Sequence, residues 1–377
     1  MNDNFCPAPW TSIYVKPTGI VESCCVSKNQ LGNINKNTIF DIINSDKNKS
    51  IKKVIIENNL PVGCASCKTG PNNFKKVLVE KFEKYLPDKS FYQNEDNFQL
   101  KLVDLRIRNT CNYACVYCDA TLSSLWASIN DKSRIHIESE SRDDIIEYVL
   151  STADTLNEIM LAGGEPLLIR ENETILEKLL EVNPDVRIFV NSNLSQIKNN
   201  KIFELLSKFK NVCWIISVDD MGDKYNYIRW PGTWDNFYSN LLELQKNTNH
   251  NITFNMVYTV LNAKSIFDCI DKLEKDGFTT FHISYVSGVP SDWLNPIYLP
   301  ISELVEIRGI LEEKIKSSTE DYSTNIYQTL LNKLQLNTTY KNTEPLFKKL
   351  KQLDIDRNLD SQHVFPELYK LINTQYE

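Results

Sequence analysis

The sequence lacks any long apolar run, and this absence limits what the chain can be. No stretch approaches the roughly 20 apolar residues that a helix needs to cross a bilayer. The first ten residues, MNDNFCPAPW, contain no basic segment followed by an apolar one, as a secretory signal would. We therefore expect a soluble, cytoplasmic protein without a membrane partner. At 377 residues the chain is long enough for two domains, or for one large domain with an appendage.

Positive charge and histidine are also scarce. The formal net charge is −7, whereas a general nucleic-acid binder usually carries a basic surface. We therefore expect no nucleic-acid partner, and a peptide or small-molecule substrate stays open. The chain has only 4 histidines. One of them, His282, falls inside a predicted strand, where a core histidine with satisfied hydrogen bonds is the better interpretation.

Cysteine, by contrast, is abundant. The chain has 10 cysteines, and cytosolic thiols are kept reduced, so we do not predict a disulfide framework. Two groups stand out, and both suggest metal binding. They are Cys6, Cys24, Cys25, Cys64 and Cys67 near the start, and Cys111, Cys115 and Cys118 further on. Cys213 and Cys269 stand alone, and we interpret both as buried core thiols.

From residue 100 onward, apolar runs alternate with amphipathic helical stretches. Strands are predicted at 101–108, 156–162, 186–191, 212–218, 252–260 and 279–286, and helices near 142–152, 171–182, 200–209, 233–246, 263–275 and 301–335. Such alternation implies parallel strands joined by right-handed crossovers. Six units are too few for a closed barrel of eight. We predict an α/β fold, a partial (β/α)6 TIM-like barrel whose site lies at the C-terminal ends of the strands.

The first 70 residues are different. They hold short segments interrupted by turns and one helical stretch at about 38–58, with too little apolar periodicity for a convincing core. Small domains of this kind usually need a metal or another staple. The predicted domains are a cysteine-rich Fe–S domain at 1–70, a connector at 71–99 with a helix near 74–85, the barrel at 100–300, and a helical extension at 301–377 with helices near 344–352 and 366–373.

Residues 108–118, RNTCNYACVYC, follow directly on the first predicted barrel strand. Three thiolates at this spacing can bind a 4Fe–4S cubane and leave its fourth iron open, whereas an electron-transfer cluster normally has a fourth thiolate. An open iron can chelate S-adenosylmethionine (SAM) and pass an electron to its sulfonium. Zinc is the alternative, but it prefers paired CxxC or CxxH knuckles.

The C-x3-C-x2-C spacing, with Tyr117 before the last cysteine, resembles the signature of the radical SAM superfamily. A Gly-Gly-Glu-Pro motif at 163–166 closes the second predicted strand, and a Ser-Val-Asp motif at 217–219 closes the fourth. The resemblance implies that SAM is bound by Tyr117, Gly163, Gly164, Glu165, Ser217, Asp219 and Arg229. A turn at the glycines and a surface ion pair at Arg229 are the alternatives. Further predicted strands end at Asn191, Asn193 and Asn262, and each of these asparagines is either a turn residue or a ligand contact. The backbone near Val286, at the end of the sixth predicted strand, loosely matches the position that binds the adenine of SAM in the family.

The N-terminal cysteines, spaced around Gly19 and a Cys-Ala-Ser-Cys segment at 64–67, resemble the half-SPASM or "twitch" domain. In that family four cysteines bind one auxiliary 4Fe–4S cluster. The resemblance implies Cys6, Cys24, Cys64 and Cys67 as ligands, and a swap of Cys25 for Cys24 stays open. In better-known members this domain follows the barrel, whereas here it precedes it. A structural zinc site is the alternative.

The resemblance implies an oxidoreductase-type radical SAM enzyme with two 4Fe–4S clusters. SAM would be cleaved to a 5′-deoxyadenosyl radical that abstracts hydrogen from a peptide or small polar metabolite, with a flavodoxin or ferredoxin as reductant. The auxiliary cluster would accept an electron, in a net oxidation or a cross-link. Alternatives are an epimerase or other redox-neutral enzyme, a methyltransferase, and a zinc- or cluster-binding interaction protein. No catalytic residue is assigned. Candidates to face the substrate are Asp220, Tyr225, Trp230, Tyr258, His282, Tyr285 and Trp293.

Overall fold

The computed structural model describes residues 4–65, 67, 74–130, 137–286, 292–317, 321–334 and 343–373. Its centre is one nine-stranded sheet with the order β3-β2-β1-β4-β5-β6-β7-β8-β9. The strands are β1 (Ser12–Val15), β2 (Ile20–Glu22), β3 (Gln30–Asn33), β4 (Leu102–Leu105), β5 (Glu158–Leu161), β6 (Arg187–Ser192), β7 (Val212–Ser217), β8 (Asn251–Tyr258) and β9 (Phe281–Tyr285). From β4 to β9 every neighbouring pair is parallel. The six predicted barrel strands correspond to β4–β9, and the predicted α/β partial barrel is confirmed.

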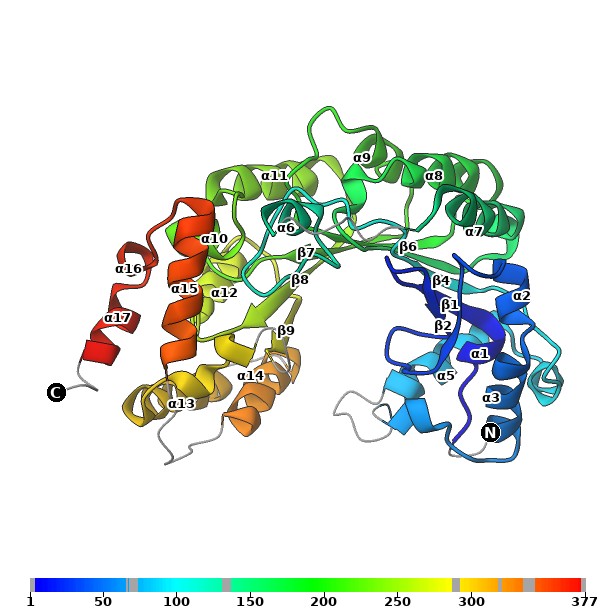
Figure 1. Cartoon of the computed structure of the whole chain (residues 1–377), viewed down its shortest axis with the longest axis horizontal. Coiled ribbons are helices and arrows are strands. Elements are labelled where there is room, and N and C mark those ends of the chain that lie inside the picture. The colour runs from blue at the N-terminus through cyan, green and yellow to red at the C-terminus, as the bar shows by residue number, and fades with distance from the viewer. Residues whose placement is uncertain are drawn as a thin grey trace.

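The helices are α1 (Ala8–Thr11), α2 (Ile39–Ile43), α3 (Asp46–Ile56), α5 (Phe74–Tyr85), α6 (Ser124–Ile129), α7 (Ser139–Ser151), α8 (Glu171–Val182), α9 (Lys201–Leu206), α10 (Gly222–Ile228), α11 (Trp234–Asn247), α12 (Ser265–Lys275), α13 (Ile301–Ser317), α14 (Asp321–Lys333), α15 (Glu344–Arg357), α16 (Ser361–Val364) and α17 (Pro366–Asn373). Figure 1 shows the sheet bent into an open arch, with α7, α8, α9 and α11 along its outer side. The N-terminal strands form one arm of the arch, and α13 and α14 lie on the other arm.

Side chains along each strand alternate between the helix-covered outer face and the concave inner face, because successive residues point to opposite sides of a sheet. In β7, Trp214 and Ile216 are fully buried, whereas Cys213, Ile215 and Ser217 are half-buried. The outer face is thus the hydrophobic core, and the inner face keeps contact with solvent. Cys269 is buried as predicted, but the prediction of a buried thiol is wrong for Cys213, which lies on the inner face.

The N-terminal region shares its sheet and its core with the barrel. Strand β1 pairs with β4 in parallel, from Ser12 opposite Leu102 to Val15 opposite Leu105, and with β2 in antiparallel fashion. Trp10 is fully buried among Phe5 and Tyr92. The sequence did not predict these three strands, which contain only three or four residues each.

Two predicted helices are each divided in the structure. The stretch at 38–58 forms α2 and α3, because Ser45 caps a new helix by accepting a hydrogen bond from the Asn48 amide. The stretch at 301–335 forms α13 and α14, and its last residue lies outside the described part of the chain. The remaining barrel helices begin and end within a few residues of their predicted bounds.

Candidate functional site

The loop that carries Cys111, Cys115 and Cys118 joins β4 to α6, at the C-terminal edge of the sheet. Two serines at the start of α6 hold it. The Ser123 hydroxyl donates to the Tyr113 carbonyl at 2.6 Å, and Ser124 Oγ accepts from the Cys111 amide at 3.1 Å. Ser123 also caps the helix by accepting from the Trp126 amide. The start of α6 therefore fixes the shape of the cysteine loop.

Gly163 and Gly164 lie directly against the backbone of this loop. A Cβ atom on Gly164 would come within 2.1 Å of the Thr110 carbonyl oxygen, and one on Gly163 within 2.7 Å of the Arg108 carbonyl oxygen. Gly163 also has a φ of +115°, which disfavours any residue with a side chain. The Gly164 amide donates to Arg108 O at 3.2 Å, and the Glu165 amide donates to Thr110 O at 2.8 Å. The two glycines let the end of β5 and the cysteine loop meet backbone to backbone.

The Glu165 carboxylate is fully buried and ties β5 to β6. Its Oε1 accepts from the Leu167 amide and the Ser192 hydroxyl, and its Oε2 accepts from the Asn193 amide at 2.7 Å. Burial raises the pKa of this carboxyl to about 7, against the opposing effect of these donors. The carboxylate thus holds the two strand ends together.

The three thiols of the loop lie close together, with Cys115 buried and Cys111 and Cys118 half-buried. Burial raises the pKa of Cys111 to about 12, and the neighbouring Cys115 adds to that rise. Burial likewise raises the pKa values of Cys115 and Cys118, and Cys118 is influenced by both other thiols. A cluster binds thiolates, so loading the site must release these protons. Three neighbouring thiols, with no fourth cysteine in the loop, suit a cubane that keeps one iron open.

Tyr117, Asp219 and Arg229 form a buried network beside these thiols. The Arg229 guanidinium pairs with Asp219 Oδ2 at 2.8 Å, donates to the Tyr117 hydroxyl at 2.5 Å, and lies 3.8 Å from the Cys115 sulfur. The Tyr117 hydroxyl donates to Asp219 Oδ2 at 2.9 Å. Asp219 is 0% exposed and Arg229 is 4% exposed. The network joins the cysteine loop to the end of β7, and Ser217 lies half-buried on the inner face nearby.

A C-terminal arginine, which the sequence did not single out, also reaches this loop. The Arg357 Nη2 donates to the Ala114 carbonyl at 2.6 Å, and its guanidinium lies 4.7 Å from the centre of the Trp126 ring. From the other side, the Ala114 amide donates to Trp230 O at 2.7 Å and the Val116 amide to Ile228 O at 2.9 Å. No motif surrounds Arg357, so no signal in the sequence could have identified it.

Four of the five N-terminal cysteines line one small apolar cavity. They are Cys6, Cys24, Cys64 and Cys67, together with Ala8, Ile55 and Leu78. Burial raises the pKa values of Cys24 and Cys64, and Cys24 lies close enough to Cys6 for the two thiols to influence each other. This donor set suits one fully ligated cubane.

Cys25 lies apart from that cavity. Cys25 is an exposed residue, and its thiol is influenced by Asp104 and Arg106, on the first barrel strand and its extension, and also by Cys67. Asp104 and Arg106 form an ion pair at 3.1 Å, and Arg106 lies over the Tyr14 ring. The structure thus separates the two adjacent cysteines, with Cys24 toward the cavity and Cys25 toward the inner face of the sheet.

The predicted substrate-facing residues divide into two sets. Tyr225 and Tyr258 are fully buried in the core, and Asp220 is 2% exposed and accepts from the Ser265 hydroxyl. Trp230, Tyr285 and Trp293 are half-buried. The prediction of a core histidine is wrong, because His282 is exposed on the inner face with its Nδ1 3.1 Å from Asn255 Oδ1.

The three strand-end asparagines also differ. All the polar atoms of the Asn262 side chain are used within the protein, on Asp219, Val257 and Thr259. Asn193 is tied to Asn112 of the cysteine loop at 3.1 Å. Asn191 on β6 has a buried side-chain oxygen with no hydrogen-bond partner among the described residues. Of the three, Asn191 alone retains an acceptor for a ligand.

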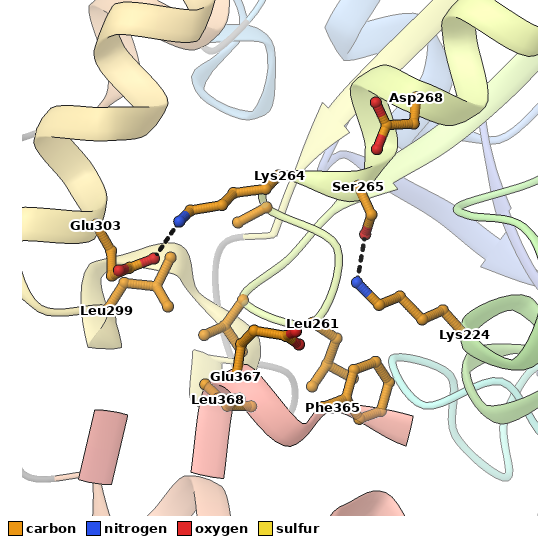
Figure 2. A pocket seen from close by; sticks show the side chains of 12 residues that line it. Lys224, Leu261, Lys264, Ser265, Asp268, Leu299, Glu303, Phe365, Glu367 and Leu368 are labelled. Carbon is orange, nitrogen blue, oxygen red and sulfur yellow. Dashed lines mark hydrogen bonds and ion pairs between the residues drawn. The ribbon is translucent and has the colours of Figure 1, made fainter. Parts of the chain in front are cut away.

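Two cavities adjoin the site. A cleft of about 380 Å³ lies beside the cysteine loop, lined by Tyr117, Cys118, Asp119, Trp293 and residues 349–356 of α15. The second, of about 310 Å³, lies between α10, the loop after β8 and the C-terminal helices. Figure 2 shows that its lysines already have partners, Lys264 with Glu303 and Lys224 with Ser265. Of the two cavities, the first is the one that a cysteine of the loop lines, through Cys118.

The described residues contain no helix long and apolar enough to cross a membrane. They also contain no group of three His, Cys, Asp or Glu side chains placed to hold a single metal ion. A cubane differs from a single ion, because it takes one thiolate at each of several corners.

The open α/β arch and its two groups of thiols define an iron–sulfur protein of the partial-barrel class. Residues 105–273 match the radical SAM superfamily, and residues 6–68 match an iron–sulfur cluster-binding domain, SPASM. The chain thus contains a radical SAM domain, and an iron–sulfur cluster-binding domain precedes it in the sequence. Its cofactors are 4Fe–4S clusters and SAM, and the predicted family and cofactors are confirmed.

Several known proteins are similar to parts of the chain. The radical SAM cyclopropyl synthase TigE of Paramaledivibacter caminithermalis is 28% identical over 54% of this chain and 44% of its own length. The GTP 3′,8-cyclase of Nautilia profundicola is 27% identical over 26% of this chain and 30% of its own length. The chain therefore spans less than half the length of either protein. SuiB of Streptococcus suis, solved with its precursor peptide SuiA, is 16% identical with a TM-score of 0.43, over 75% of this chain and 64% of that one.

Proposed function

We propose that this protein cleaves SAM reductively at the cluster of Cys111, Cys115 and Cys118 and oxidises a peptide or small polar metabolite. When bound, the open iron of that cluster supplies one electron to the sulfonium of SAM, which gives a 5′-deoxyadenosyl radical able to abstract hydrogen. The observation that carries the proposal is the group of three neighbouring thiols, Cys111, Cys115 and Cys118, in the loop that packs against the Gly163–Gly164 backbone.

The residues proposed to hold SAM surround this point. Gly163, Gly164 and Glu165 follow the end of β5 and lie against the cysteine loop, and Ser217 ends β7, two strands away in the sheet. Tyr117 lies beside Cys118 in the adjoining cleft. Asp219 and Arg229 act through Tyr117, because both are buried and bonded to its hydroxyl. In this arrangement the ion pair fixes the tyrosine while the loop backbone and Ser217 meet the cofactor.

The substrate is proposed to lie on the inner face of the arch. That face is half-exposed along β6–β9 and carries Asn191, Asn255 and His282. Amide and imidazole groups can donate to or accept from a peptide backbone or a polar metabolite. The unpartnered Asn191 oxygen would accept a hydrogen bond from such a substrate.

The auxiliary cluster, held by Cys6, Cys24, Cys64 and Cys67, is proposed to take up the electron that a substrate radical must lose. Four protein thiols leave no open iron, which suits an electron conduit. Forming a cyclopropyl ring, as the name of TigE describes, joins two carbons at the expense of two C–H bonds and is a net oxidation. A ring closure or cross-link of this class would need an electron acceptor of that kind.

Anaerobic reconstitution with iron and sulfide tests the proposal. We expect about eight iron atoms per chain, four for each cluster, and release of 5′-deoxyadenosine from SAM with dithionite as the reductant. A Cys111/Cys115/Cys118→Ala variant should keep about four iron atoms per chain. It should release no 5′-deoxyadenosine. Formation of S-adenosylhomocysteine would indicate a methyltransferase instead, and unchanged cleavage by the triple variant would refute the assignment. A flavodoxin or ferredoxin is the proposed physiological reductant.

A further inference from the structure

Arg357, the last residue of α15, brings a buried charge from the C-terminal extension to the cysteine loop. Its side chain is 4% exposed. Its Nη2 donates to the Ala114 carbonyl at 2.6 Å, across 243 positions of sequence, and its Nη1 lies 3.4 Å from the Tyr227 carbonyl. In Figure 1, α15 lies alongside α10, on the arm of the arch opposite the N-terminal strands.

The same guanidinium also acts on the loop through Trp126. It lies 4.7 Å from the centre of that ring, and the Trp126 indole donates to the Cys115 carbonyl at 2.9 Å. One arginine thus supports both carbonyls that flank the Cys115 backbone, Ala114 O directly and Cys115 O through the tryptophan. A rigid, planar donor group is well suited to fix two such positions at once.

Arg357 has no ion-pair partner among the described residues, unlike the other arginine near Cys115. Arg229 is paired with Asp219 at 2.8 Å, so their charges cancel. Among the described residues, no carboxylate lies within the 4.0 Å of an ion pair with Arg357, and its Nε has no hydrogen-bond acceptor. The nearby Asp354 carboxylate instead accepts from Tyr227 and Ser361. Burial lowers the pKa of Arg357 to about 10, which leaves it charged at neutral pH.

We propose that Arg357 is a positioning residue for the Cys111–Cys118 loop and that its unpaired charge favours the reduced form of the cluster held there. The inference rests on the proposed function, because it assumes that this cluster is reduced before SAM is cleaved. Each added electron makes the cluster more negative, and a fixed positive charge in a buried site stabilises the more negative state. The C-terminal extension would then set how readily the enzyme accepts an electron.

The test measures the midpoint potential of the SAM-binding cluster in the full-length, reconstituted protein by redox titration followed by electron paramagnetic resonance. The response of the signal to SAM identifies this cluster. In Arg357→Met we expect the equilibrium constant for reduction to fall about ten-fold, which is about 59 mV for one electron. Arg357→Lys should keep a potential near that of the wild type but retain less iron, because it keeps the charge and loses the fork. The control is Arg308→Met, which removes an exposed arginine paired with Glu312 on α13.

A second variant changes the charge next to Arg357 without altering a buried side chain. Asp356 is exposed beside Arg357, and Asp356→Asn should shift the potential upward, by less than the Arg357→Met change. If Arg357→Met cannot be loaded with iron, this variant and Arg357→Lys decide the question. A loaded Arg357→Met with the wild-type potential, or a downward shift in Asp356→Asn, overturns the inference. If instead the wild-type protein releases no 5′-deoxyadenosine, the proposed function fails, whatever the potentials are.

Discussion

Gly164 packs so closely against the cysteine loop that a side chain at this position would clash with the loop backbone. We expect Gly164→Ala to displace the loop, because a Cβ atom would lie 2.1 Å from the Thr110 carbonyl oxygen. Iron content should fall from about eight to about four per chain, with a loss of about 1–3 kcal/mol in the free energy of unfolding. Gly309→Ala in α13 is the control, since nothing lies within 4 Å of its Cβ. It should be neutral or stabilising by about 0.5–1 kcal/mol. Full iron content in Gly164→Ala would contradict the contact.

Asp220 gives a pH-dependent prediction. Burial raises the pKa of its carboxyl from 3.8 to about 6. A carboxyl with a higher pKa in the folded state stabilises the fold at low pH, and that contribution is lost as the pH rises through about 6. Asp220→Asn should therefore remove a decline on the order of 2–3 kcal/mol between pH 4 and 6. Asparagine can still accept from the Met221 amide and donate to Ser265. Urea unfolding across this pH range measures how the free energy of unfolding changes with pH. Asp223→Asn, at an exposed carboxylate, is the control. An unchanged pH dependence in Asp220→Asn would contradict the prediction.

Among the elements, β1 links the N-terminal region to the barrel. We therefore expect the core of the N-terminal region to unfold together with the barrel. Trp10, just before β1, is fully buried and its indole donates to Asn94 O at 2.9 Å. Trp10→Ala should cost about 3–5 kcal/mol. Far-ultraviolet circular dichroism should show one transition at a lower temperature, whereas two separated transitions would mean independent cores. Phe40→Ala, at a side chain 63% exposed, is the control and should leave the transition in place.

The elements also show how far the sequence could lead. The six barrel strands were predictable because each is an apolar run followed by a helix of regular period. Strands β1–β3 were not, because no helix separates them from one another and β1 finds its partner β4 some 90 positions away, from Ser12 to Leu102. Spacing alone identified Cys111, Cys115 and Cys118. The support from Trp126 and Arg357 depends on contacts between distant segments that no local pattern encodes.

For the whole molecule, the sheet explains how a cluster domain can precede the barrel in sequence. The loops around β1 and β2 carry the cavity of the N-terminal cysteines, and β4 leads directly into the second cysteine loop. Because β1 and β4 are neighbours in the sheet, the two sites are carried by adjoining strands of one sheet, with the N-terminal cysteines near the start of β1 and the second group after the end of β4. We therefore expect the shared sheet to hold the two cysteine groups at a fixed separation.

This arrangement predicts that the two cysteine groups can be separated by function. Cys24→Ser should reduce the iron content from about eight to about four atoms per chain and still release 5′-deoxyadenosine from SAM. Substrate turnover should fall at least ten-fold, because the substrate radical then lacks its electron acceptor. Cys25→Ser is the matched control, since the adjacent thiol lies outside the cavity, and it should keep about eight irons. Iron and sulfide analysis with product detection by mass spectrometry distinguishes the two variants. If Cys25→Ser lost the iron instead, the ligand would be the exposed thiol, and a Cys24→Ser protein with full turnover would mean that the second cluster takes no electron from the reaction.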